Sequence, residues 1–424
     1  MPRSNPVGGC STDEVAAAPR RLLDLVLFNH VDQDLVPLRI AELRGHVDLM
    51  GFAETEYTHS TGERKPLRFK SEWLTGAPFV HYRPIRALAN VTSECNIRAL
   101  AAHPQNTWLR RKKQGPQWVN RCRESFSRNA LGQLFEELGG GDDDWALISD
   151  ADEIPRPAAL AVLRKLMHQI KPTKCWLRMP PAGMAPNRSE AFIRRQIMHR
   201  LPAVSLGAIH HFKYTVGCER PWRLPGATWL KGPIAVPGAL LKTVGAQSAR
   251  TFDGCFWSGW RNSCRDISRR AISNASWHMS SLSGGFEGHL QKMRENSAHA
   301  LYTNDSRTNQ FEPRFVLERA LQCQHGEDQT LKVKAAKASR KGLALHYLPT
   351  PWGQGRPLPR YPDVPMSVQR ALSEGRLRHF LGWNTTTAAA EGAGVEPLGQ
   401  ALYLSDPKLL DESVVPHPVY RLTR

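Results

Sequence analysis

The sequence has no long hydrophobic run. Nowhere in its 424 residues do about 18 consecutive apolar residues occur, the length that a membrane-spanning helix needs. The first twenty residues also lack the apolar core of a signal peptide. We therefore expect a chain without a membrane span of its own, so that a place in the secretory pathway would require an anchor or signal supplied elsewhere.

Closely spaced cysteines are also missing. No CxxC pair or zinc-type spacing occurs among the eight cysteines, which stand at positions 10, 95, 122, 175, 218, 255, 264 and 323. This spacing excludes a cysteine-based zinc cluster. An even count allows disulfides in an oxidising compartment, and buried free thiols are equally compatible with it. A secretory setting is favoured by five Asn-x-Ser/Thr sequons, which begin at Asn90, Asn187, Asn274, Asn304 and Asn384.

Acidic residues are fewer than basic residues. The chain has 57 Lys and Arg against 39 Asp and Glu, a net charge of +18 that favours anionic partners such as nucleotide phosphates. The basic clusters at 110–113 and 332–341 are not interleaved with periodic aromatics, as a single-stranded nucleic-acid platform would be. We expect a solvated basic face and no nucleic-acid partner.

The beginning of the chain alternates between apolar runs and a helical pattern. The run at 22–30 is dense and stops at polar residues, which is typical of a buried parallel strand. Apolar residues at helical spacing follow over 35–47, with Gly45 at the end, and 47–57 is apolar again. This order predicts an α/β, Rossmann-like domain with a mixed, mostly parallel central sheet.

Two further predicted helices, 124–141 and 157–170, flank an acidic motif. Between them "ALISDADEIP" is an apolar strand followed by Asp150, Asp152 and Glu153. An Asp-x-Asp at the carboxyl edge of a parallel sheet can share a divalent cation, which in turn binds the oxygens of a diphosphate. The alternative is that Asp152 and Glu153 begin the next helix, where acidic residues favour the positive end of the helix dipole.

Four ordered segments stand out: "LVLFNHVDQDLVPLRIAEL", "FAETEYTHSTGERKPLRFK", "RESFSRNALGQLF" with "ISDADEIP", and "ASWHMSSLSGGFEGHLQKMRENSAHALY". In this order they resemble glycosyltransferase family 17. The resemblance covers roughly residues 21–383. It implies a GT-A-type fold and inverting, metal-dependent transfer of N-acetylglucosamine from UDP-GlcNAc to a sugar hydroxyl, such as a β-linked mannose of an N-glycan core. It also implies a glycan or glycoprotein acceptor, a Golgi or secretory-lumen location and association with a membrane.

The resemblance and the pattern together assign site residues. For the cation, with Mn²⁺ expected and Mg²⁺ as the alternative, they are Asp150, Asp152 and His278, where a backbone-bonded core histidine is the other interpretation of His278. Donor contacts are expected from Asn29, Glu54, Arg121, Arg128 and Lys292, although Asn29 could instead cap the next helix. The general base is sought among Asp253, Glu219 and Glu287.

We expect three parts in the chain: a flexible segment at 1–20, a catalytic domain at 21–383, and a low-complexity linker and tail at 384–424. The catalytic domain divides into a nucleotide-sugar half, about 21–155, and an acceptor half, about 156–383. A basic carbohydrate- or nucleic-acid-binding protein would explain the charge and the tryptophans without catalysis. A metal phosphohydrolase is disfavoured, because the sequence has no second His and Asp cluster for a two-metal site.

Overall fold

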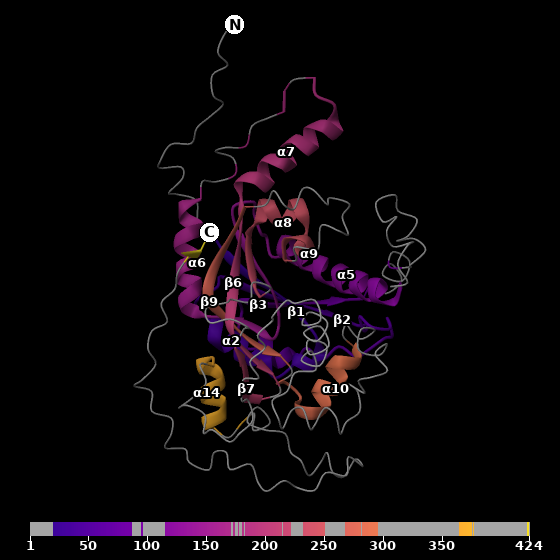
Figure 1. The fold of residues 1–424 in the computed structure, drawn as a ribbon, viewed down its shortest axis with the longest axis vertical. Helices are drawn as coiled ribbons and strands as arrows, with labels where there is room; N and C mark the ends of the chain where they lie inside the picture. Colours follow the sequence, from indigo (N-terminus) through magenta and orange to yellow (C-terminus); the bar gives the residue numbers. More distant parts are fainter. Residues whose placement is uncertain are drawn as a thin grey trace, which may run out of the picture.

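A computed structural model describes the fold (Figure 1). The described residues are 20–86, 95, 115–170, 173, 177, 180–181, 183–213, 215–221, 232–250, 268–280, 282–295, 364–374, 376 and 422–423. For 115–118, 208–213, 215–221, 268–269, 422–423 and the single positions His30, Arg121 and Phe286, the backbone alone is described.

One mixed sheet runs through the molecule. Its order is β10-β9-β6-β8-β4-β1-β2-β3, and β1, β2, β3 and β4 are mutually parallel. The strands of the path are β1 (Leu22–Phe28), β2 (Leu49–Thr55), β3 (Val80–Ile85), β4 (Trp145–Asp150), β6 (Pro202–Lys213), β8 (Ile234–Pro237), β9 (Ser268–Ser280) and β10 (Leu422–Thr423). Two strands lie off it: β5 (Glu153–Pro155) pairs with β9, and β7 (Thr215–Pro221) pairs with β6. The predicted α/β class with its mixed sheet is confirmed.

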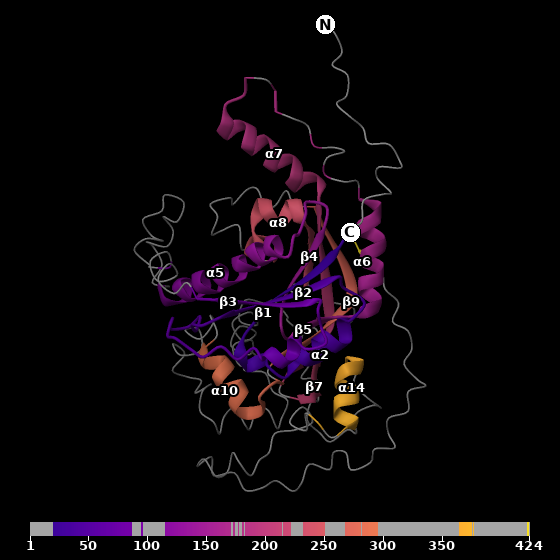
Figure 2. The same cartoon turned by 180° about the vertical axis from the view of Figure 1, so that it is seen from behind.

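Helices cover both faces of this sheet (Figures 1 and 2). On one face lie α5 (Gly115–Glu137), α8 (Gly238–Val244) and α9 (Ala246–Arg250), and on the other α2 (Leu35–Leu43) and α6 (Pro157–Gln169). The remaining helical segments are η1 (His30–Asp32), η2 (Ser71–Leu74), α7 (Pro186–Arg200), α10 (Gly285–Glu295) and α14 (Met366–Ser373).

Strand periodicity explains the two cores. Leu23 and Leu25 of β1 pack in the cluster with α5, whereas Leu22 and Val26 pack in the cluster with α2 and α6. Successive strand residues face opposite sides of a sheet, so a strand buried on both faces must be apolar throughout. The dense apolar run at 22–30 therefore forms the buried parallel strand predicted for it.

The predicted helices are present with shifted ends. Helix α2 ends at Leu43, and Gly45 follows it with φ +79°, a left-handed conformation that favours glycine. The helix predicted at 124–141 is α5, which begins nine residues earlier at Gly115, and the helix predicted at 157–170 is α6. Among the described residues, no helix combines the length and apolar character that crossing a bilayer requires.

Strand β9 is irregular against its parallel partner β6. The register slips on both sides of Ala208, and Asn274 of β9 has φ +52°. A residue with positive φ in a strand marks a bulge, in which one strand has more residues than the other. The bulge lies just before Trp277 and His278.

A disulfide joins Cys95 to Cys122 of α5, at a sequence separation of 27. The sequence left disulfides and free thiols equally open, and for this pair the structure has the bond. It attaches Cys95 to the amino-terminal half of α5.

Candidate functional site

Polar side chains gather where the parallel strands end. Asp150 is the last residue of β4 and is aligned with Leu27 of β1, and Glu54 near the end of β2 is aligned with Phe28. Asn29 comes directly after β1. Ligands of α/β sheets bind outside the carboxyl ends of the strands. These residues are therefore placed where the sequence predicted the site.

The acidic motif forms a strand, a turn and a second strand. Asp152 lies in the turn after β4, and Glu153 opens β5, where it is paired with His278 of β9. The backbone N–H of Met279 donates to Asp152 O at 2.7 Å, which fixes the turn against β9. Helix α6 begins only at Pro157. The interpretation that Asp152 and Glu153 begin this helix is therefore wrong.

Two buried arginines neutralise part of the motif. Arg128 of α5 donates to Asp150 Oδ1 at 3.1 Å, and Arg250 of α9 to Asp150 Oδ2 at 2.8 Å. Arg250 also holds both oxygens of Glu153, at 2.6 and 2.7 Å, and the Asp150 N–H donates to Glu153 Oε2 at 3.0 Å. Burial disfavours the charged form of Arg250, but Asp150 and Glu153 outweigh it and raise its pKa.

A lysine neutralises Asp152, the remaining carboxylate of the motif. The Lys292 ammonium, on α10, lies 2.7 Å from Asp152 Oδ2 and 2.8 Å from Asp32 Oδ1, while His278 Nε2 is 3.5 Å from the same Asp152 oxygen. Burial acts to raise the pKa of Asp152, but Lys292 and His278 outweigh it and hold that pKa well below its usual range. For Asp32, burial prevails over Lys292 and raises the pKa to about 6.

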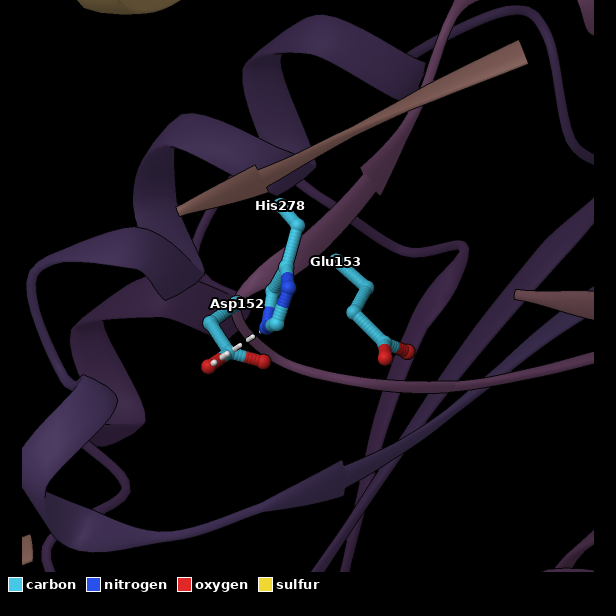
Figure 3. A group of neighbouring side chains, drawn as sticks. All are labelled: Asp152, Glu153 and His278. Carbon is cyan, nitrogen blue, oxygen red and sulfur yellow. Dashed lines mark ion pairs between the residues drawn. The ribbon is translucent and has the colours of Figure 1, made fainter. Parts of the chain in front are cut away.

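Asp152, Glu153 and His278 can be brought together around one metal ion. Each offers a ligand atom, all within 4.8 Å of one another (Figure 3). Two carboxylates and an imidazole suit Mn²⁺, and carboxylates also suit Mg²⁺, so the donor set fits the predicted cation. Two of the three predicted ligands, Asp152 and His278, belong to this group. Glu153 stands in the place predicted for Asp150, whose oxygens face the arginines.

Asn29 and Glu54, two predicted donor contacts, are hydrogen-bonded to other residues of the protein. Asn29 Oδ1 accepts from Lys65 Nζ at 3.3 Å, and its side chain makes no capping hydrogen bond. Glu54 is fully buried; its carboxylate accepts from the N–H groups of Arg68 and Phe69 and from the Tyr82 hydroxyl at 2.9 Å. Burial is the main cause of its raised pKa. Glu54 therefore anchors the chain that follows the second strand.

The remaining predicted residues are partly outside the described structure. Arg121 lies in α5 and Glu219 in β7, but neither side chain is described, and Asp253 lies outside the described residues. Glu287 is exposed in the first turn of α10. The general base thus stays a prediction.

A histidine that the sequence analysis did not single out lies near the motif. Ser127 donates its hydroxyl hydrogen to Arg123 O at 2.9 Å, so Tyr57 and His59 Nε2 must donate to Ser127 Oγ, at 3.0 and 3.1 Å. Burial lowers the pKa of His59 to about 4, against the attraction of Glu124. His59 is therefore a neutral imidazole in one fixed tautomer. Its signal in the sequence was the "THS" after the second strand.

The fold and site define a class before they define a family. Parallel strands end in an acidic motif here, and buried arginine and lysine side chains and a possible metal-binding group lie beside it. This arrangement is typical of α/β enzymes acting on phosphorylated ligands. The sequence model described as glycosyltransferase family 17 matches residues 10–179, so this stretch, 170 of the 424 residues, is similar to that family. A comparison with curated proteins found no match. The matched residues include the acidic motif, whereas Arg250, His278 and Lys292 come from the unmatched part.

Proposed function

We propose that the protein is an inverting N-acetylglucosaminyltransferase that uses UDP-GlcNAc and a divalent cation, Mn²⁺ or alternatively Mg²⁺. The observation that carries the proposal is the position of Asp152, buried at the carboxyl edge of the sheet with Glu153 and His278 beside it. An acidic motif at this edge that can hold a cation is suited to binding the diphosphate of a sugar nucleotide.

The cation would be held mainly by Asp152 and His278, with Glu153 as a weaker third ligand because Arg250 already holds both its oxygens. When bound, it offsets the negative charge that builds on the departing diphosphate. The protein contributes cations of its own, because Arg128 and Lys292 lie on either side of the motif within hydrogen-bonding distance of its carboxylates. Arginine and lysine are both phosphate partners, so these side chains support diphosphate binding at the same edge.

The chemical step would be a single displacement. A protein carboxylate or histidine removes the proton of the attacking sugar hydroxyl, the new bond forms at the anomeric carbon, and UDP leaves from the opposite face. Inversion follows because one displacement reverses the configuration. Asp253, Glu219 and Glu287 remain the predicted bases.

The acceptor is proposed to be a β-linked mannose of an N-glycan core on a glycoprotein, in the Golgi or secretory lumen and in association with a membrane. The disulfide between Cys95 and Cys122 supports an oxidising compartment, because such bonds are rare where thiols are kept reduced. Acceptor identity depends on loops rather than on fold, so it must be tested directly.

The test combines a donor and acceptor panel with one pair of variants. The full chain is assayed against UDP-sugars and glycans by mass spectrometry, with and without Mn²⁺, and donor binding is measured by calorimetry. We expect Mn²⁺-dependent transfer of N-acetylglucosamine, abolished in Asp152→Ala but retained in Asp142→Ala, a control at an exposed aspartate paired with Lys242.

Other outcomes would favour a different function. If the wild type shows no metal-dependent binding of any UDP-sugar, the proposal is refuted. A carbohydrate- or nucleic-acid-binding protein would keep its partner after Asp152→Ala, because its affinity would not depend on the acidic motif.

A further inference from the structure

We infer that Lys292 and the divalent cation are alternative partners of Asp152, so that metal binding displaces the lysine ammonium toward the donor's diphosphate. The inference rests on the proposed function and adds to it a residue that positions the metal and the donor relative to one another. The two partners would meet at one oxygen atom, Asp152 Oδ2.

Two groups already converge on this oxygen. Lys292 Nζ is 2.7 Å from Asp152 Oδ2, and His278 Nε2 is 3.5 Å from it. The Asp152 and Lys292 side chains are 7% and 16% exposed, so little water screens the pair. A cation bound by Asp152 and His278 would therefore lie close to the ammonium, and the two positive charges repel each other strongly in a buried site.

Lys292 has a second carboxylate partner, so its ammonium can move away from Asp152 and still be paired. Its ammonium lies 2.8 Å from Asp32 Oδ1, and Asp32 belongs to η1, directly after the first strand. The lysine stem is long and flexible, so the ammonium can leave Asp152 while it stays near Asp32. The incoming diphosphate offers it new oxygen partners.

The arrangement has a thermodynamic consequence. Without metal, Lys292 keeps Asp152 and Asp32 neutralised, and this makes metal binding alone weaker. When a diphosphate is present, the displaced ammonium gains a partner, and metal and nucleotide then strengthen each other's binding. Removal of the lysine charge should therefore change the two affinities in opposite directions.

The experiment uses Lys292→Gln, which keeps a hydrogen-bond donor for Asp32 and Asp152 but removes the charge. Calorimetry measures the affinity of the full chain for Mn²⁺ alone and for UDP in saturating Mn²⁺. We expect Mn²⁺ to bind about tenfold tighter than to the wild type, and UDP to bind about tenfold more weakly, each tenfold step being about 1.4 kcal/mol. Lys292→Arg, which keeps the charge, should bind Mn²⁺ like the wild type.

Misfolding cannot imitate this result, because a damaged site would lose both affinities. If Lys292→Gln does not fold, Lys292→Met takes its place with the same expectation, and a failure of both variants to bind Mn²⁺ tighter than the wild type overturns the inference. When the wild type binds Mn²⁺ and UDP but the neutral variants bind Mn²⁺ no more tightly, only this inference fails. A wild type that binds neither Mn²⁺ nor a UDP-sugar refutes the proposed function as well.

Discussion

Glu153 belongs to the acidic motif, but its carboxylate serves mainly as the partner of a buried arginine. Both its oxygens are held by Arg250, and its side chain is 2% exposed. Asp152 instead faces Lys292 and His278. The two neighbouring carboxylates thus have different charge partners, and their substitutions should have different effects.

We predict that Glu153→Gln lowers the free energy of unfolding by about 3 kcal/mol, because Arg250 loses a buried charge partner. The variant should keep most of its Mn²⁺ affinity, whereas Asp152→Asn should lose it. Denaturant unfolding and Mn²⁺ calorimetry on both variants test this. A Glu153→Gln protein that loses Mn²⁺ affinity as severely as Asp152→Asn would show Glu153 to be an essential ligand.

His59 predicts a pH dependence of stability. Its pKa of about 4 in the folded protein lies below the ordinary value of about 6.5, so the unfolded chain binds the proton more readily. The neutral imidazole therefore stabilises the fold fully above pH about 6.5, and this contribution is lost as the pH falls towards 4. Unfolding titrations at several pH values should show a decline that is about 1–2 kcal/mol smaller in His59→Gln. Parallel pH profiles for the two proteins would contradict the assignment.

Residues close to the motif in sequence could be predicted, and their distant partners could not. Asp150 and Asp152 were identified from the strand that precedes them. Arg250 was missed because it is 97 residues from Glu153, in a short helix without a distinctive pattern. Asp32 was missed because nothing in its own segment reveals that Lys292, 260 residues away, pairs with it.

At the scale of elements, α10 is held in place at its start and by its lysine. Gly284 donates its N–H to Asp34 at 2.9 Å and has φ +69°, and a Cβ on it would lie 2.9 Å from Gly288 Cα. The helix begins at Gly285, so a change here alters its direction and the position of Lys292 further along it.

Gly284→Ala should therefore destabilise the protein by about 2 kcal/mol and weaken UDP binding, since it combines positive φ with a backbone clash. Gly45→Ala is the matched control: its φ is +79°, but a Cβ there has no neighbour within 4 Å. We expect about 1 kcal/mol from this control and unchanged UDP affinity. Equal effects of the two variants on UDP binding would argue against the role given to α10.

Elements of the first half were predictable, and most of the second half was not. Apolar periodicity alone identified β1, α2, β2, the carboxyl half of α5, β4 and α6. The strands are buried within the central sheet, and each helix packs on it with a regular apolar face. In contrast, β8 inserts antiparallel beside β4, and β9 pairs with both β5 and β6. These pairings join segments that are distant in sequence, which local patterns do not record.

At the scale of the molecule, a short segment near the C-terminus returns to the central sheet. Strand β10, Leu422–Thr423, pairs with β9, and α14 packs against α2 through Val368 and Ala371. The predicted boundaries at 20 and 383 stay predictions. These contacts nevertheless join a piece of the expected tail to the same sheet as the site.

The disulfide allows a prediction about the whole fold. The bond between Cys95 and Cys122 restricts the unfolded chain across a separation of 27 residues, which corresponds to about 3–4 kcal/mol of stability. The double variant Cys95→Ser/Cys122→Ser should unfold at correspondingly lower guanidinium concentration than the oxidised wild type. Identical midpoints for the two proteins would show that the bond does not constrain the chain.

The bulge in β9 makes the position of His278 depend on the number of residues in the strand as much as on their identity. Residues 272–277 of β9 span one more position than residues 206–210 of β6, which they accompany. Because side chains alternate along a strand, this single extra residue decides that His278 rather than Trp277 is turned toward Asp152. The site should thus tolerate Asn274→Gly, whereas insertion of one residue next to Asn274 would bring Trp277 to the position of His278, exchange the imidazole for an indole and leave every ligand type in the sequence unchanged.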